Sequence, residues 1–183
     1  MIIVVSGCDK VGKTTFAQAL SKILGWEIIK RPKNLLPSTD FANEKTMLAQ
    51  YRLMYALFKD KNVIFDRYYE SELVYSYLRG EDKLEDEGND LWMFDKEFSQ
   101  GNTLFIILDE DQRVLTKRFS SDREEYLKAE EVNNILDRFS RFVNRTEVDC
   151  LYLNSHVSFK EKMSMVLEYI AEKQLGEEFE WLT

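Results

Sequence analysis

The sequence predicts an α/β fold in which a five-stranded parallel sheet is covered by helices on both faces. Short apolar runs rich in β-branched residues alternate with longer stretches whose apolar residues follow helical spacing. The short runs are apolar almost throughout, which is typical of parallel strands buried on both faces. No repeat or linker-like segment divides the 183 residues, so we expect one domain spanning 1–183. The predicted strands are Ile2–Ser6, Trp26–Lys30, Asn62–Asp66, Thr103–Asp109 and Cys150–Asn154.

The remaining elements follow from what lies between these strands. The first strand has no basic flank ahead of it, so we interpret it as a buried strand rather than a signal peptide or a membrane span. A glycine-containing loop then leads into a predicted helix, Thr14–Leu24. Apolar residues three and four apart predict three more amphipathic helices, within 47–58, 132–143 and 159–170. The strongly acidic stretch Glu81–Asp90 is interpreted as a solvated loop between helices.

Composition excludes several classes of protein. Thirty-three Asp and Glu against 25 Lys and Arg give a net charge of −8, which argues against nucleic acids and anionic membranes as partners. Two cysteines and one histidine exclude a disulfide framework and a zinc cluster. Arg138, Arg141 and Arg145 share a helix face, which we interpret as solvated and held by ion pairs within the helix. We therefore expect a cytoplasmic protein whose partners are small molecules.

A phosphate-binding loop is the strongest motif. Residues 7–14, GCDKVGKT, fit the pattern G-x-x-x-x-G-K-[ST] and stand directly between the first strand and a helix, as that motif requires. Gly7 and Gly12 allow the backbone to form a nest of inward-pointing N–H groups, to which the helix dipole adds. Lys13 would reach the β- and γ-phosphates of ATP, and the Thr14 hydroxyl would ligate the bridging Mg²⁺. The further loop residues that we assign to the ATP site are Lys10, Val11 and Thr15.

A second pair of charges ends the third predicted strand. Asp66 and Arg67 follow an apolar run, so both reach the edge of the sheet where parallel sheets bind ligands. Asp66 is suited to hold Mg²⁺ through a water, and Arg67 to grip a second phosphate with two hydrogen bonds. The alternative is a local ion pair between these neighbours that caps the next helix.

These motifs resemble the thymidylate kinase family of P-loop nucleoside monophosphate kinases, and the resemblance covers essentially the whole chain. The run D-R-Y-x-x-S-x-x-V-Y at 66–75 is similar to the family signature D-R-[YFH]-x-x-S-x-x-A-[YF], and the phosphate loop carries the family's acid at its third position. The resemblance implies a P-loop NTPase fold in which Asp9 contacts the acceptor's sugar and Lys10 the phosphates. It also implies that Arg67 binds the acceptor's phosphate, while Ser71 and Tyr75 line the base or sugar side of the pocket.

Other assignments follow only from the resemblance. A segment at about 117–128 resembles the mobile LID, in which Arg118 and Arg123 would close over the transferring phosphate. Asn154 lies in a stretch similar to the loop that cups adenine. The family's homodimer would be packed through helices, here those near Tyr75 and Trp92.

The residues that read the base are less well defined. Tyr51 and Arg52 are the candidates for stacking on the base and hydrogen-bonding to it. Tyr51 also falls on an apolar helical stripe, so packing in the core is an equal alternative for it.

The residues after the second strand bear on the acceptor. A nucleoside kinase needs a general base for a neutral hydroxyl, whereas the acceptor of a monophosphate kinase is already ionised. Related deoxynucleoside kinases place a glutamate at the end of this strand ahead of a proline, and this chain has Lys30-Arg31-Pro32 there. Glu27 stands roughly 10 Å further from that edge, at ~3.3 Å per residue.

We therefore predict ATP- and Mg²⁺-dependent phosphorylation of a deoxypyrimidine monophosphate, with dTMP as the favoured acceptor. Two alternatives stay open: a deoxynucleoside kinase acting on a 5′-hydroxyl, and a non-catalytic P-loop nucleotide switch. The predicted catalytic residues are Asp9, Lys13, Arg67, Arg118 and Arg123.

Overall fold

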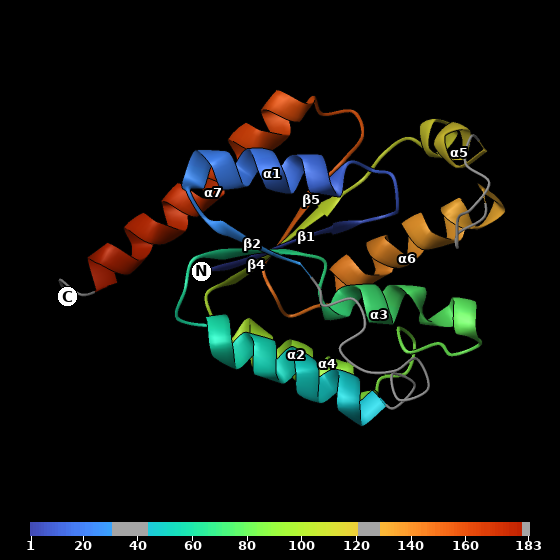
Figure 1. The fold of residues 1–183 in the computed structure, drawn as a ribbon, viewed down its shortest axis with the longest axis horizontal. Coiled ribbons are helices and arrows are strands. Elements are labelled where there is room, and N and C mark those ends of the chain that lie inside the picture. Colours follow the sequence, from blue (N-terminus) through green and yellow to red (C-terminus); the bar gives the residue numbers. More distant parts are fainter. Residues whose placement is uncertain (31–43, 121–128, 181–183) are drawn as a thin grey trace.

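The structure, a computed structural model, describes residues 1–30, 44–120 and 129–180 (Figure 1). Five parallel strands form one sheet in the order β2-β3-β1-β4-β5, which confirms the predicted fold class. Each strand begins and ends within one residue of its predicted bounds. The strands are β1 (Ile2–Gly7), β2 (Glu27–Lys30), β3 (Val63–Asp66), β4 (Thr103–Leu108) and β5 (Cys150–Leu153). The central strands β1, β3 and β4 are almost wholly buried, whereas the edge strands β2 and β5 are partly exposed.

Helices cover both faces of the sheet, and α1 and α7 lie together on one of them (Figure 1). The other face is covered by α2, α3, α4 and α6, with α5 beside them. The α-helices are α1 (Lys13–Leu24), α2 (Glu44–Phe58), α3 (Tyr69–Tyr75), α4 (Asp90–Ser99), α5 (Gln112–Ser120), α6 (Val132–Arg145) and α7 (Phe159–Glu180), and the short 3₁₀ turns are η1 (Ser76–Arg79) and η2 (Ala129–Glu131).

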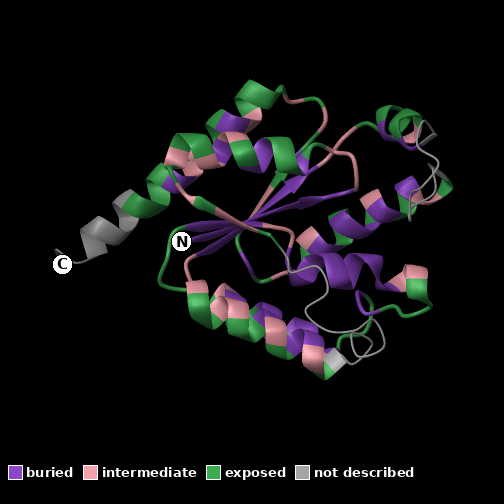
Figure 2. Cartoon of the chain, in the orientation of Figure 1, coloured by how far each residue is buried: buried purple, intermediate pink, exposed green. Residues whose placement is uncertain are grey.

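Strand β1 shows how the two cores arise. Its side chains alternate, so that Ile3 and Val5 pack against α1 and α7 while Ile2 and Val4 pack against the opposite layer. All four are fully buried, and Figure 2 shows the central strands buried between helices whose outer faces are exposed. In the described part of the chain, no helix is both long enough and apolar enough to span a bilayer.

The glycine at the end of β1 permits a close approach between strands. Gly7 has a φ of 135°, and a Cβ at this position would lie 2.2 Å from the carbonyl oxygen of Leu108 on β4. We expect Gly7→Ala to lower the free energy of unfolding by about 3 kcal/mol in urea titrations, because it adds a steric overlap to backbone strain. Gly25→Ala is the matched control: its φ is 71° but its Cβ would meet nothing within 4 Å, so about 1 kcal/mol is expected. Equal losses in the two variants would contradict this explanation.

The acidic segment is a loop whose acids are mostly exposed, and the exposed Arg141 pairs with Asp137 one turn earlier on the same helix, as predicted. The prediction was wrong for Arg138 and Arg145, which find partners outside their helix. Arg138 is only 4% exposed, donates to the carbonyl of Val74 at 2.7 Å and pairs with Asp82 at 2.6 Å. Arg145 donates to the carbonyl of Leu84, a fully buried residue inside the acidic segment. The acidic segment therefore turns back onto α6, and its acids pair with arginines more than 50 positions away. Helical spacing cannot reveal such partners, because they come from another element.

Candidate active site

The phosphate loop lies at the carboxyl end of β1 and leads directly into α1 (Figure 1). Lys13, the first residue of α1, is 6% exposed, and its Nζ donates to the carbonyl of Cys8 at 2.6 Å. The Asp9 carboxylate is 3.6 Å from the same Nζ. Burial lowers the pKa of Lys13 to about 8, against the opposing influence of Cys8, Asp66 and Glu70. Lys13 is therefore a costly buried cation in the free protein, and an anion at the loop would stabilise its charge.

The side chains that would hold Mg²⁺ meet beside this loop. In the sheet, Val5 of β1 is paired with Asp66 of β3, which brings the carboxylate to the start of α1. The Thr14 hydroxyl donates to Oδ2 of Asp66 at 3.3 Å. A hydroxyl and a carboxylate are the oxygen ligands that Mg²⁺ prefers, and a site of this kind takes its other ligands from phosphates and water. These two residues therefore fit the ion that the sequence predicts.

Arg67 is held against the phosphate loop. Its backbone is left-handed, with a φ of 67°, and its N–H donates to the carbonyl of Val5 at 3.1 Å. Its guanidinium forms an ion pair with Asp9 and lies 5.7 Å from the centre of the Tyr75 ring. The cation predicted for the acceptor's phosphate therefore stands next to the loop predicted for the donor's phosphates.

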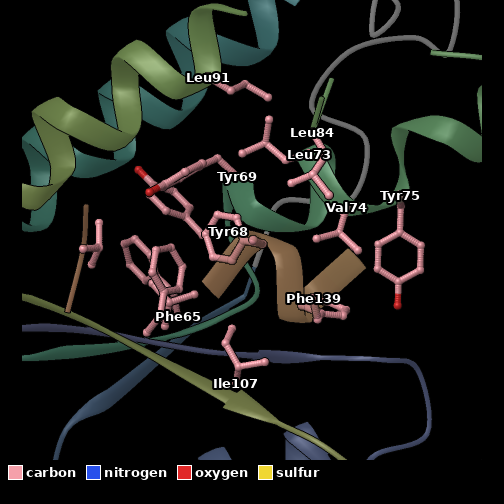
Figure 3. Packing of buried hydrophobic residues seen from close by; sticks show 14 of the residues in the cluster. Phe65, Tyr68, Tyr69, Leu73, Val74, Tyr75, Leu84, Leu91, Ile107 and Phe139 are labelled. Atoms are coloured by element: carbon pink, nitrogen blue, oxygen red, sulfur yellow. The ribbon is translucent and has the colours of Figure 1, made fainter. Parts of the chain in front are cut away.

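Tyr75 and Ser71 lie on α3, the helix that follows Arg67 in the chain. Tyr75 is 7% exposed, and Figure 3 shows its ring reaching from α3 with the hydroxyl at the far end. No oxygen or nitrogen of the described residues hydrogen-bonds that hydroxyl. Burial raises the pKa of the Cys8 thiol to about 11, and the contact of the thiol with the Tyr75 hydroxyl acts in the opposite direction. Burial also raises the pKa of Tyr75, so the hydroxyl stays protonated. Ser71 is buried and donates to the carboxylate of Glu70 at 2.9 Å.

Arg118 of α5 is also brought to the phosphate loop. Nζ of Lys10 donates to the Arg118 carbonyl at 2.8 Å, and Nη1 of Arg118 donates to the Lys10 carbonyl at 2.7 Å. The Arg118 guanidinium pairs with Glu110 at 3.2 Å, and the Lys10 ammonium lies 5.0 Å from the centre of the Phe119 ring. Two cations from distant parts of the sequence thus meet at the loop.

Three other predicted residues lie on α2 and directly after β5. Tyr51 is buried in the core, edge-on to Tyr68 at 5.2 Å, as the packing alternative requires. Arg52 lies on the exposed side of α2 and pairs with Glu97 of α4 at 3.1 Å. Asn154 is exposed after β5 and accepts the N–H of His156 at 2.6 Å.

Of the remaining predicted residues, two belong to the phosphate loop and the start of α1, and the others lie outside the described ranges. Thr15 is exposed on the first turn of α1, and Val11 is half-buried between the two cores. Arg123 and most of the predicted LID, residues 121–128, lie outside the described residues, as do Arg31 and Pro32.

Sequence reasoning missed one buried residue of this region, Glu70. It is fully buried on α3, and its carboxylate accepts the Ser6 hydroxyl at 2.6 Å and the Tyr68 N–H at 2.9 Å. The available signal was its place in the sequence, three residues after the motif arginine.

The sheet order, the loop between β1 and α1 and the charged end of β3 together define a P-loop NTPase fold. No family model and no curated protein matches the sequence. Among solved structures, the YorR protein from Bacillus subtilis, in complex with phosphorylated GDP, has a TM-score of 0.71 and 22% identity, over 95% of this chain and 98% of its own.

Two other similar structures are named kinases. Deoxyadenosine kinase from M. mycoides, with the products dCMP and dCDP bound, has a TM-score of 0.65 and 18% identity, over 94% of this chain and 100% of its own. Thymidylate kinase from Candida albicans has a TM-score of 0.59 and 17% identity, over 94% of this chain and 92% of its own. The neighbours of this fold thus include kinases for nucleosides and for nucleoside monophosphates.

Proposed function

We propose that this protein is an ATP- and Mg²⁺-dependent kinase of a deoxynucleoside monophosphate, with dTMP as the favoured acceptor. The observation that supports this most strongly is the position of Arg67, whose guanidinium is held by Asp9 of the phosphate loop. A cation beside the phosphate loop supports a second anion site end to end with the first, which is what transfer between two phosphates needs.

On the donor side, the residues of the phosphate loop bind and orient ATP. The loop's N–H groups and the Lys13 ammonium surround the β- and γ-phosphates, and Thr14 and Asp66 are the residues that would hold Mg²⁺. When bound, the ion neutralises negative charge on the phosphates. Arg118 adds a second cation at the loop, and Asn154 is the proposed contact for adenine.

On the acceptor side, Arg67 and Lys10 align the monophosphate for in-line attack. Asp9 contacts the sugar in this proposal, while Ser71 and Tyr75 line the pocket beside it. Tyr51 and Arg52 are given no role in reading the base, because one ring is packed in the core and the other side chain is paired with Glu97. Arg123 stays a prediction for the LID.

The end of β2 argues for a charged acceptor. This strand ends at Lys30, whereas Glu27 stands at the opposite end, paired in register with Val63 at the start of β3. Glu27 is therefore distant from the edge that carries Asp66 and Arg67. A phosphate acceptor needs no general base, because its oxygen is ionised at neutral pH.

A nucleoside kinase is the second candidate, favoured by the likeness to deoxyadenosine kinase from M. mycoides. An assay of ADP release with ATP and Mg²⁺ across nucleosides and nucleoside monophosphates separates the two. We expect turnover of dTMP and none of thymidine. Turnover of thymidine but not dTMP would establish the second candidate, and turnover of neither class would favour a nucleotide switch.

A homodimer is also proposed, packed through helices that include α4, which carries Trp92 and is one of those predicted for the contact. Tyr75 and Trp92 are buried within the chain, at 7% and 8% exposed, so they are not available to a partner. The exposed large apolar side chains described on the neighbouring helices α2 and α4 are Leu53, Leu57 and Met93, each more than half exposed.

We expect sedimentation velocity to show a dimer at micromolar concentration, and Leu57→Glu to shift it to monomer by placing a charge on that surface. Lys22→Glu, an exposed change on α1, is the control and should leave the dimer intact. A wild-type monomer at that concentration would contradict the proposal.

A further inference from the structure

Glu70 is a fully buried carboxylate that the proposed reaction does not use. A buried carboxylate is costly unless donors compensate for the lost water. Glu70 has three such partners: the Ser6 hydroxyl at 2.6 Å, the Tyr68 N–H at 2.9 and 3.1 Å to its two oxygens, and the Ser71 hydroxyl at 2.9 Å. These partners belong to β1, to the turn after β3 and to α3.

The turn held by Glu70 is the one that presents Arg67. A left-handed backbone costs about 1 to 2 kcal/mol for a residue other than glycine, so the surrounding structure must hold it in place. Two hydrogen bonds, donated by the backbone N–H groups of Arg67 and Tyr68, hold this turn in place. Arg67 donates to the carbonyl of Val5, and Tyr68 donates to Glu70.

The same carboxylate reaches the base of the phosphate loop. Ser6, whose hydroxyl it accepts, directly precedes Gly7 and is fully buried. Glu70 therefore links the strand that begins the donor's loop to the turn that carries the acceptor's arginine. Its oxygens face buried donors, so it is not placed to take a proton from a substrate.

We propose that Glu70 is a positioning residue that fixes the Arg67 turn against β1 and thereby sets the affinity for the acceptor's phosphate. This inference rests on the proposed function. A misplacement of about 1 Å in a positioning group costs as much as 10²-fold in rate, so the turn's geometry matters as much as the charge it carries.

The test is Glu70→Gln, which keeps the size of the side chain but turns an amide N–H₂ toward donors. We expect the KM for the monophosphate acceptor to rise about tenfold while the KM for ATP stays within twofold. Amide hydrogen exchange at Tyr68 should become faster, because its N–H loses part of its acceptor.

Glu72→Gln is the matched control. Glu72 lies on the same helix, is 5% exposed, and pairs with Arg79 and Lys83 rather than with the Arg67 turn. This variant should leave both the acceptor KM and exchange at Tyr68 within twofold of wild type.

The outcomes separate this inference from the proposed function. If wild type phosphorylates a monophosphate and Glu70→Gln leaves its KM unchanged, or raises both KM values equally, the positioning role is overturned. The same holds if Glu72→Gln raises the acceptor KM as much. If wild type itself phosphorylates no monophosphate, the proposed function fails first, and the acceptor role of Glu70 fails with it.

Discussion

Lys13→Ala is expected to lower kcat/KM for phosphoryl transfer by a factor on the order of 10² to 10³, the scale of one lost electrostatic donor. The reason is the position of Lys13 at the loop, where its ammonium is buried and its pKa is lowered to about 8. Because burial disfavours this charge in the free protein, the variant should unfold at a temperature no lower than that of wild type. Loss of activity without loss of stability would separate a catalytic role from a structural one.

The control for this variant is Lys22→Ala on the same helix. Lys22 is exposed near the end of α1, away from the loop, so kcat/KM should stay within twofold. Steady-state kinetics with ATP and the acceptor measure both variants. Near-normal turnover of Lys13→Ala would show that the role assigned to the loop is wrong.

Arg67→Ala should raise the KM for the acceptor about 10²-fold, equivalent to about 3 kcal/mol, and leave the KM for ATP within a few-fold. Two effects act together. The acceptor's phosphate loses its contact with the Arg67 guanidinium, and the Asp9 carboxylate, now without its ion-pair partner, is left beside that phosphate. Steady-state kinetics with each substrate varied in turn measure the split.

Two companion variants sharpen this test. Arg67→Ala combined with Asp9→Asn should recover part of the loss if repulsion by the bare carboxylate contributes. Arg113→Ala removes an exposed arginine of α5 and should leave both KM values unchanged. Equal changes in the two KM values for Arg67→Ala would remove its assignment to the acceptor.

The sequence predicted the parts of this molecule that depend on burial and local backbone. Each strand is an apolar run, so its place could be deduced from residue type alone. A parallel sheet also predicted that β1 and β3 end at the same edge, although the direct pairing of these two strands, which brings Thr14 to Asp66, was not predicted. The seven-residue helix α3 was not predicted as an element, because it is too short to show a period.

The sequence did not predict the hydrogen-bond and ion-pair partners that come from elements distant in the chain. Nothing in the spacing of Arg138 shows that it is buried against Asp82 and the end of α3. Nor does the motif around Arg67 show that its neighbour in space is Asp9, more than 50 positions earlier. Glu70 escaped notice for the same reason, since a glutamate on a helix is ordinarily exposed.

The most direct test of two adjoining anion sites is the binding of a bisubstrate compound in which adenosine and thymidine are joined through five phosphates. Isothermal titration to wild type and to Arg67→Ala, each with Mg²⁺, measures whether both ends are held. We expect wild type to bind this compound at least tenfold more tightly than ATP, and Arg67→Ala to bind it no more tightly than ATP. Equal affinity of wild type for the compound and for ATP would contradict this expectation.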